Sequence, residues 1–412
     1  MEENRHNEDR SAPDTRRHIC VVSETYFPQV NGVALTLNHL VKGLQGLGHR
    51  VSVVRPRQHR SDSSVHDPSV TVVAGLPLPG YKGLQFGLPA GTLLQQLWMR
   101  SRPDVVYVAT EGPLGWSAVS VARRLAIPVF SGFHTNFHSY SQYYGVGYLH
   151  GTVLRYLRWF HNRTRGTLVP TSDLRDRLQT LGFKKVLCLG RGVDSRLFDP
   201  VRRCGILRGQ WGLGDDDLAV IYVGRIAGEK NLSLALAAYH AIKQTVNSAR
   251  FVVVGDGPLR GSLEAQDSDL IFSGMQLSSR LATHYASADL FLFPSETETF
   301  GNVVLEAMAS GLGVIAYDYA AARSHITNGE TGILVPLGDS RAFVAAAVKL
   351  ASQPTELKEV RRQAREYSRL ITWPRVVERF AALLNGNDDQ VRGPLRTLVG
   401  GQKLATAARG RI

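Results

Sequence analysis

Cysteine is scarce in this chain of 412 residues, and no hydrophobic run is long. Cys20, Cys188 and Cys204 lack a CxxC spacing, which argues against both a disulfide framework and a zinc site. No apolar run approaches the roughly 18 residues of a membrane-spanning helix. Residues 1–17 are polar and charged, without the apolar segment of a secretory signal. We therefore expect a cytoplasmic protein.

Acidic residues are outnumbered by basic ones. The chain has 48 lysines and arginines against 35 aspartates and glutamates, a formal charge of +13. Such an excess favours anionic partners, which include nucleic acid, acidic lipid headgroups and phosphorylated small molecules. No nucleic-acid-reading module is recognisable, so we expect no nucleic acid partner. Residues 1–17 and 387–412 are predicted to be flexible tails, the second of them basic.

Short apolar segments rich in β-branched residues alternate with helical patterns such as Val33–Leu47, Leu232–Val246 and Val303–Ser310. Strands that are apolar throughout and alternate with helices predict parallel sheets covered on both faces. The predicted strands are Ile19–Val22, Val51–Val54, Val70–Val73, Asp104–Val108, Pro128–Phe130, Thr167–Val169, Ala219–Val223, Arg250–Val254, Asp269–Phe272, Leu290–Phe293, Val314–Ala316 and Gly332–Val335.

The alternation pauses over Val193–Gly214 and then starts again, which together with the length predicts two domains and a linker. The fold class is therefore α/β, with two Rossmann-like doubly wound domains that face each other across a cleft. We place these domains at 18–196 and 197–371, and we expect a helix over 372–386 to pack back on the first. Ligands of such sheets bind outside the carboxyl ends of the strands, so the chemistry should lie on loops that line the cleft.

Polar residues follow predicted strands in the first half of the chain. Gly32, with Asn31 before it, precedes a helix, where backbone N–H groups and the helix dipole favour an anion. An ordinary βα turn that needs a glycine would have the same sequence. His134 follows a buried strand directly, at a position where parallel sheets present functional groups, and catalytic and structural roles are equally open for it.

Two cations stand near strand ends in the second half. Gly224 and Arg225 end one strand, and Lys230 opens the next helix. The rigid fork of an arginine and the compact charge of a lysine together suit a diphosphate, although a surface pair of basic residues is the plainer alternative. Gly255–Pro258 fails the dinucleotide-binding fingerprint because Arg260 replaces its third glycine, so we do not expect a dehydrogenase.

The segment Glu296–Gly311 carries the strongest signal. It follows a strand, turns at Gly301 and becomes a helix, which places Glu298 near the helix start and Glu306 inside the helix. A carboxylate in such a helix needs a partner or a ligand, because unpaired burial is costly. Ribose hydroxyls would satisfy Glu306, while Glu298 and the amides around Gly301 would hold a sugar and its phosphate. Two capping or surface glutamates are the alternative.

Together these motifs resemble a retaining glycosyltransferase of family 4, which has the GT-B fold. The resemblance covers His18 to about Leu384, and its signature is two glutamates separated by seven residues, here Glu298 and Glu306. The other segments that match in order and spacing are Asn31–Val33, Phe133–Thr135, Gly224–Asn231 and Gly255–Pro258.

The resemblance implies roles for individual residues. Arg225 and Lys230 would neutralise the leaving diphosphate, and the first domain would carry the acceptor while the second binds the nucleotide sugar. Glu298 would orient the sugar, and His134 would lie near the reacting carbon. The implied donor-binding residues are Asn31, Gly32, Gly224, Asp256, Gly257, Met275, Phe300, Gly301, Asn302 and Glu306, and the acceptor-side candidates are Glu111 and Tyr140.

No metal and no other cofactor is implied, because the two cations and the helix dipole stabilise the leaving group, and the nucleotide sugar is a co-substrate. Asp215–Asp217 precedes a strand in a glycine-rich turn, and we interpret it as a solvated acidic turn, not as a metal site. The loop Ala320–His325 departs from the family pattern, which leaves the sugar and base preference open.

Glu24–Val33 and Arg191–Asp194 are similar to the branch of the family that glycosylates diacylglycerol-type or inositol lipids. That branch includes bacterial mannosyltransferases that use GDP-mannose and plant-type sulfoquinovosyltransferases that use a UDP-linked sugar. The aromatic and basic residues between Tyr140 and Arg165 suit contact with an anionic membrane at the inner face of the cell membrane, or equally a core helix with basic outer positions.

We therefore expect transfer of a hexose, with GDP-mannose favoured, to a lipid or glycolipid acceptor. The alternatives are a UDP-sugar-dependent transferase for glucose, glucuronate or sulfoquinovose that acts on a lipid or polysaccharide, and a sugar-nucleotide epimerase, which shares the fold and uses no acceptor.

Overall fold

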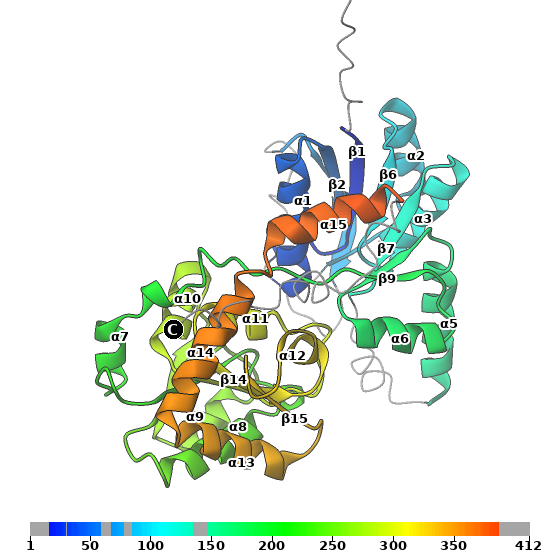
Figure 1. Cartoon of the computed structure of the whole chain (residues 1–412). Helices are drawn as coiled ribbons and strands as arrows, with labels where there is room; N and C mark the ends of the chain where they lie inside the picture. Colours follow the sequence, from blue (N-terminus) through cyan, green and yellow to red (C-terminus); the bar gives the residue numbers. More distant parts are fainter. Residues whose placement is uncertain (1–15, 30, 59–66, 78–84, 135–146, 387–412) are drawn as a thin grey trace, which may run out of the picture.

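The computed structural model describes residues 16–29, 31–58, 67–77, 85–134 and 147–386 of the chain. They form two lobes, each built on its own parallel sheet with apolar cores on both faces (Figure 1). The protein is therefore of the α/β class, as the alternating pattern predicts. None of the helices in these ranges combines the length and the apolar character that a bilayer span requires.

The N-terminal lobe contains a seven-stranded sheet in the order β3-β2-β1-β6-β7-β8-β9. Helix α1 covers one face of this sheet, and α2 and α3 cover the other, which explains why the strands are apolar throughout. The strands are β1 (His18–Val22), β2 (Arg50–Pro56), β3 (Val70–Val73), β6 (Val105–Val108), β7 (Val129–Gly132), β8 (Thr167–Val169) and β9 (Val186–Cys188), and the helices are α1 (Gly32–Gly46), α2 (Gly91–Arg100), α3 (Pro113–Arg124), α5 (Gly147–His161) and α6 (Ser172–Thr180).

The C-terminal lobe contains a six-stranded sheet in the order β12-β11-β10-β13-β14-β15. In each sheet the first strand lies between the next strand and a later one: β1 lies between β2 and β6, and β10 lies between β11 and β13. The chain therefore reverses its direction of winding there and opens a crevice for ligands. The elements are β10 (Ala219–Val223), β11 (Arg250–Val254), β12 (Leu270–Gly274), β13 (Leu290–Phe293), β14 (Gly313–Tyr317), β15 (Ile333–Val335), α7 (Gly205–Gln210), α8 (Leu232–Lys243), α9 (Arg260–Gln266), α10 (Ser278–Ser287), α11 (Asn302–Ala309), α12 (Ala320–His325), α13 (Ser340–Ala351) and α14 (Pro354–Ser368).

Each strand predicted from the sequence forms, with ends that differ by no more than one or two residues. The structure adds β9 and an antiparallel pair, β4 (Gly75–Pro77) and β5 (Gln85–Gly87), that the sequence pattern does not predict. Each of these strands has only three residues, and none is as rich in β-branched residues as the equally short β8 and β15.

The segment Val193–Gly214 is not the irregular linker that its sequence suggests. It contains the short helix α7, and Phe198, Trp211 and Leu213 are buried in the core of the C-terminal lobe. Phe198 packs edge-on against Tyr285 of α10, with ring centroids 5.8 Å apart. Tertiary packing, and not a local repeat, orders this segment.

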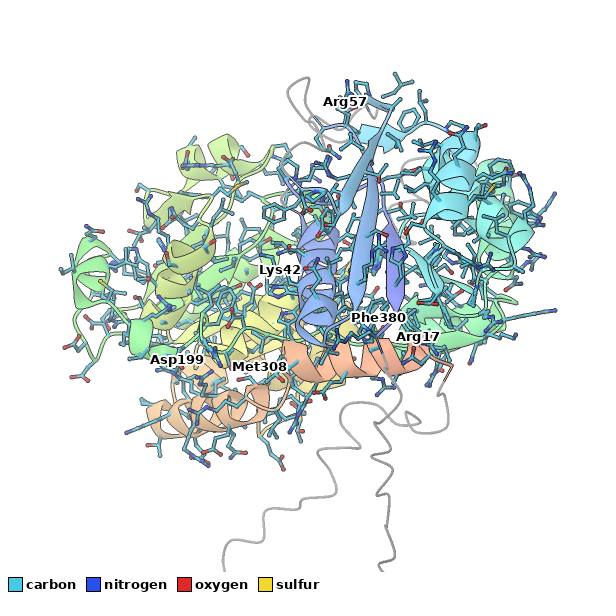
Figure 2. The ribbon with its side chains drawn as sticks, turned by 90° about the horizontal axis from the view of Figure 1, so that it is seen from above. Arg17, Lys42, Arg57, Asp199, Met308 and Phe380 are labelled. Carbon is cyan, nitrogen blue, oxygen red and sulfur yellow. The ribbon has the colours of Figure 1, made fainter. Side chains whose placement is uncertain are left out.

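The last described helix, α15 (Trp373–Leu384), runs from the C-terminal lobe onto the N-terminal lobe (Figure 1). It packs on α1, where the side chain of Val377 fills the space beside Gly43; a Cβ atom at Gly43 would lie 2.3 Å from it. Figure 2 shows Phe380 of this helix beside the N-terminal sheet, and its ring meets Tyr107 edge-on with centroids 4.9 Å apart. Through this contact the helix packs against Tyr107 of the central strand β6.

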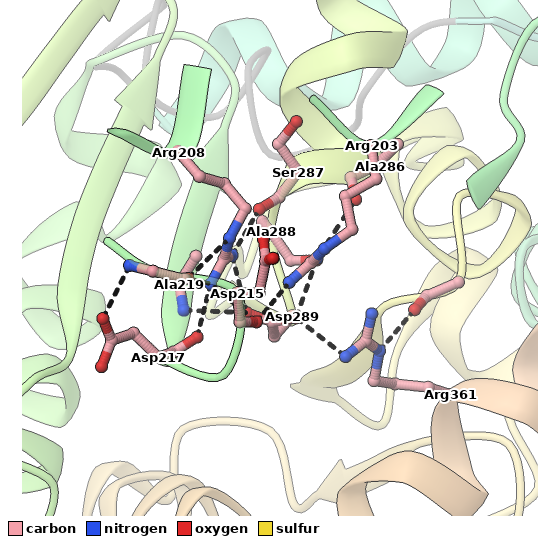
Figure 3. A network of polar contacts seen from close by, with 12 residues as sticks. Arg203, Arg208, Asp215, Asp217, Ala219, Ala286, Ser287, Ala288, Asp289 and Arg361 are labelled. Carbon is pink, nitrogen blue, oxygen red and sulfur yellow. Dashed lines mark hydrogen bonds and ion pairs between the residues drawn. The ribbon is translucent and has the colours of Figure 1, made fainter. Parts of the chain in front are cut away.

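A polar network fixes the opposite, amino-terminal edge of the C-terminal sheet (Figure 3). Asp289 accepts hydrogen bonds from three arginines, Arg203 at 3.1 Å, Arg208 at 3.1 Å and Arg361 at 2.8 Å. Arg208 is fully buried and also donates to the carbonyl oxygens of Gly214, Asp215, Asp217 and Ser287. Because every charge in this network has a partner, it ties the chain before β10 to the start of β13.

Candidate active site

A cavity of about 590 Å³ lies between the two lobes, next to the carboxyl ends of β10 and β13. This volume is within the range of about 300–1,000 Å³ that is usual for small-molecule sites. The N-terminal lobe contributes Thr25, Asn31, Gly32, Val33, His134 and Arg191, and the C-terminal lobe contributes Val223, Gly224, Arg225, Lys230, Phe293, Glu298, Thr299, Phe300, Gly301, Asn302, Val303 and Glu306.

The two cations predicted to meet a diphosphate both line this cavity. Arg225 follows β10 and is 57% exposed, with the carboxylate of Glu229 at 3.6 Å. The Lys230 ammonium is more enclosed and donates to Glu298 at 2.5 Å. An exposed arginine fork and a shielded lysine therefore face the same space from one strand end.

The two glutamates of the signature motif occupy different environments. Glu298 lies in the loop before α11 and accepts hydrogen bonds from Lys230 and from the Ser295 hydroxyl at 2.8 Å. Glu306 lies inside α11, where the Tyr285 hydroxyl donates to it at 3.2 Å. Burial raises the pKa of Glu306 to about 7, although the hydrogen bond from Tyr285 opposes the shift. Among the described residues Glu306 has no cationic partner, and its carboxylate retains capacity to accept hydrogen bonds.

Two helices begin at the cavity. Gly301 has a φ of +93°, a left-handed conformation that favours glycine, and it leads into α11 without a side-chain cap. Facing it, Asn31 caps α1 by accepting hydrogen bonds from the amides of Val33 and Ala34. A Cβ atom at Gly32 would meet nothing within 4 Å, so the backbone there is open to the cavity. Both helix starts offer positive partial charge to an anion.

His134 follows β7 and is held from two sides. Its Nδ1 lies 3.4 Å from an Arg191 nitrogen, which can only donate, so the ring proton is on Nε2 and points to the Tyr107 hydroxyl at 3.1 Å. Burial lowers the pKa of His134 to about 3, and the neighbouring Arg191 and His161 act in the same direction. The ring is therefore neutral near pH 7 and fixed in orientation. Its carbonyl accepts a hydrogen bond from the Thr299 hydroxyl of the other lobe at 3.3 Å.

Several predicted site residues do not line the cavity. Asp256 is more than half exposed, and Gly257 packs so closely on the backbone of Ile226 that a Cβ atom would lie 2.2 Å from its oxygen. This segment thus supports the Arg225 loop from behind. Met275 is 68% exposed and also lies outside the cavity lining.

The acceptor-side candidate Glu111 is not among the lining residues either. Glu111 is buried near the start of α3, and its carbonyl accepts a hydrogen bond from the Tyr156 hydroxyl at 2.6 Å. Tyr140 lies outside the described residues. Next to Glu111, burial raises the pKa of Glu24 to about 7, and Glu24 accepts a hydrogen bond from the amide of Leu114 at 3.1 Å. Glu24 was not predicted as a site residue, and a carboxylate buried at a helix start has no distinct sequence signature.

Arg191 is the main residue that sequence reasoning missed. It lies after β9, a strand that the sequence pattern does not predict, and it enters the cavity lining from the N-terminal lobe. Its guanidinium is 5.6 Å from the ring centre of Phe300, so it also contacts the other lobe. In the sequence, Arg191–Asp194 indicates only the branch of the family and predicts no role for Arg191 in the site.

Two family models together match most of the chain. The model described as "Glycosyltransferase Family 4" matches residues 30–197, and the one described as "Glycosyl transferases group 1" matches residues 217–353. These matches fall on the N-terminal and the C-terminal lobe respectively. The cavity residues therefore come from both matched regions.

Several curated proteins are similar to the chain. A GDP-mannose-dependent alpha-mannosyltransferase of Mycobacterium tuberculosis is 33% identical, over 78% of this chain and 84% of its own length. An alpha-monoglucosyldiacylglycerol synthase of Streptococcus pneumoniae is 29% identical over 73% and 70%. The sulfoquinovosyl transferase SQD2 of Arabidopsis thaliana is 28% identical over 87% and 71%.

The fold has solved counterparts. The structure of Anabaena HepE in complex with UDP covers 90% of this chain and is itself covered completely, with a TM-score of 0.71 at 18% identity. Such a likeness shows the two-domain GT-B fold. With the family matches and the identity to the mannosyltransferase, it leads to one conclusion. The chain belongs to glycosyltransferase family 4 and has the GT-B fold.

Proposed function

We propose that this glycosyltransferase moves a hexose with retention from a nucleotide diphosphate sugar to a lipid acceptor, with GDP-mannose as the favoured donor. The GDP-mannose-dependent relative supports the donor, at 33% identity. The diacylglycerol in the name of the pneumococcal relative supports a lipid such as diacylglycerol as acceptor. A UDP-linked hexose is the alternative donor, supported by the UDP in the HepE complex.

The convergence of Arg225, Lys230 and the start of α11 on one cavity carries this proposal. When the bond between a hexose and a diphosphate breaks, negative charge develops on the leaving phosphate. Donors aimed at that charge stabilise the transition state, and a single well-placed donor contributes about 2.7–4 kcal/mol. The carboxylate of Glu306 is available to accept hydrogen bonds from the ribose hydroxyls, and that of Glu298 from the hydroxyls of the hexose.

In the retaining mechanism that we propose, the acceptor attacks on the face from which the diphosphate leaves. The proton of the acceptor hydroxyl then passes to an oxygen of the departing phosphate. The neutral His134 has a pKa of about 3 and carries no exchangeable positive charge near pH 7, so we assign it the shaping of the sugar site and no proton transfer. The hydrogen bond that its Nε2 donates to Tyr107 and the one that its Nδ1 accepts from Arg191 keep its ring in one place.

We also propose that transfer needs no metal ion. The positive charge that a divalent ion would supply comes from Arg225, Lys230 and the dipole of α11, which face one space. Turnover in the presence of EDTA should equal turnover without it. A loss that added magnesium restores would contradict this part of the proposal.

Release of nucleoside diphosphate from a panel of nucleotide sugars, with and without membrane lipids, tests the reaction. We expect release that depends on lipid and is greatest with GDP-mannose. An epimerase would instead isomerise the nucleotide sugar in the absence of lipid. Isomerisation without transfer would therefore replace the proposed function by that alternative.

Arg225→Ala tests the leaving-group role, and Arg362→Ala is its matched control. Arg362 is similarly exposed, at 53%, and likewise pairs with a glutamate four residues on, but it lies on α14 away from the cavity. We expect Arg225→Ala to lower kcat by about 10²–10³, as for the loss of one transition-state donor. Arg362→Ala should turn over normally. Equal rates in both variants would remove the assigned role of Arg225.

A membrane contact through α5 would bring the enzyme to a lipid acceptor at the inner face of the cell membrane. On this helix Arg155, Tyr156, Arg158 and Trp159 are exposed, whereas Leu157 is buried. Exposed aromatic and basic side chains on one face are typical of helices that lie on anionic bilayers. Sedimentation with anionic liposomes should show binding that salt weakens and that the double variant Arg155→Glu/Trp159→Ser abolishes. Binding that survives this variant would contradict docking through α5.

A further inference from the structure

Arg191 is a buried cation whose polar contacts are all uncharged. Its side chain is almost wholly enclosed, with the residue only 5% exposed. The guanidinium donates to the carbonyl of Gly32 at 3.1 Å and to the hydroxyl of Thr36, and it lies 3.4 Å from Nδ1 of His134. No aspartate or glutamate among the described residues forms an ion pair with it.

Such an arrangement is unfavourable unless a counter-charge arrives. A buried cation without an anion loses hydration that hydrogen bonds to neutral groups only partly replace. Burial lowers the pKa of Arg191 to about 10, with a small opposing effect from Tyr107, so the side chain is still charged near pH 7. The fold therefore holds a desolvated positive charge in place.

The position of Arg191 indicates where the counter-charge would come from. Arg191 lines the interdomain cavity together with Arg225 and Lys230. Those two cations each have a carboxylate, at 3.6 Å and 2.5 Å respectively, whereas Arg191 has none among the described residues. It also lies against the first turn of α1, where the helix dipole favours an anion.

We propose that Arg191 is the centre of an anion subsite in the cavity, which binds an oxyanion of the substrate through its guanidinium. The oxyanion comes from one of two sources, the diphosphate of the donor or an acidic group of the acceptor. The assignment to a donor or an acceptor rests on the proposed function. Binding of a simple oxyanion does not, so the two ideas fail separately.

Inorganic phosphate is the probe for the shared chemistry. In buffers matched for ionic strength with chloride, phosphate at about ten times its dissociation constant should raise the unfolding temperature of the protein by about 1–3 °C. Arg191→Gln keeps a hydrogen-bond donor for Gly32 but removes the charge, and it should lose this response. Arg191→Lys should retain part of it, and Arg362→Gln should retain all of it.

A second measurement distinguishes the two sources. If the diphosphate is the ligand, Arg191→Gln should weaken UDP and GDP binding by tenfold or more in calorimetry, and saturating UDP should abolish the phosphate response of the wild type. If an acidic acceptor group is the ligand, nucleotide affinity should not change and the phosphate response should persist with UDP bound.

Two results would overturn the subsite. One is a phosphate response of folded Arg191→Gln equal to that of the wild type, and the other is a wild-type protein that does not respond to phosphate at all. Either would leave Arg191 as a structural tie between α1 and the segment after β9. The proposed transferase function would still stand in that case, because the phosphate test uses no substrate.

Discussion

Arg191 and Arg208 are both buried arginines, but Arg208 has a carboxylate partner and Arg191 has none among the described residues. Arg208, in the C-terminal lobe, forms an ion pair with Asp289 at 3.1 Å inside the network of Figure 3. Arg191, in the N-terminal lobe, has hydrogen bonds only to neutral groups within the part of the chain that the structure describes. Arg208 lies at the amino-terminal edge of its sheet, and Arg191 lies at the cavity. The difference indicates that a compensated buried charge belongs to the scaffold, and an uncompensated one marks a place for a ligand.

The largest expected effect concerns stability. Arg208→Gln should lower the free energy of unfolding by about 3–5 kcal/mol, because it breaks a buried ion pair and leaves several carbonyl oxygens without donors. Arg191→Gln should cost about 1 kcal/mol or less, since the carbonyl of Gly32 still accepts from the Thr36 hydroxyl. Urea unfolding of both variants measures this. An equal loss would break the comparison between the two arginines.

Acid stability gives the next effect, and it concerns His161, a buried and neutral side chain of the N-terminal lobe. Burial lowers the pKa of His161 to about 3, so between pH 6.5 and 3 the unfolded chain binds a proton that the folded chain does not. The contribution of the neutral His161 to the free energy of unfolding is therefore complete above pH 6.5, and it falls as the pH decreases through this window. His161→Phe should lose about 1.4 kcal/mol less than the wild type per pH unit.

Urea unfolding at pH 6 and pH 4 measures the difference between His161→Phe and the wild type. The Ser131 hydroxyl, which loses its contact with His161, still has Thr164 as a partner at 3.1 Å, so the variant should fold at neutral pH. Parallel acid profiles for the two proteins would show that His161 does not stay neutral in the folded state.

The smallest effect concerns Glu306, an uncompensated buried carboxyl in the C-terminal lobe. Its pKa of about 7 lies above the usual range, so its burial makes the folded state less stable as the pH rises from 4.5 to 7. Ribose hydroxyls that donate to the carboxylate would favour its charged form. The affinity for GDP-mannose should therefore rise up to about tenfold between pH 6 and pH 8.

Calorimetric titration with GDP-mannose at the two pH values tests this, because the nucleotide sugar does not itself titrate there. Glu306→Gln is the control, and we expect weaker binding that does not depend on pH. Since Glu306 lines the same cavity as Arg191, a confirmed pH dependence would sharpen the comparison: uncompensated charge follows the cavity and not the lobe. A pH-independent wild type would contradict the role of Glu306.

Much of the fold could be predicted, because local patterns encode it. Apolar β-branched segments such as Arg250–Val254 form strands wherever both faces of a sheet are covered. The placement of Glu298 before α11 and of Glu306 inside it could be predicted, because the turn at Gly301 and the helix depend on residues that are close in the sequence. Strands as short as β9, and the ordering of Phe198 in the supposed linker, depend on distant partners that no local pattern contains.

The sequence by itself determined the α/β alternation, the order of the motifs and the family, since each depends on residues near one another in the chain. Only the tertiary structure decided that Arg191 would lie against Gly32, 159 residues away, and that no carboxylate of the described residues would pair with it. It likewise decided that His134 and Glu306 would have pKa values of about 3 and about 7. Desolvation depends on everything that packs around a group, and packing brings together segments from the whole chain.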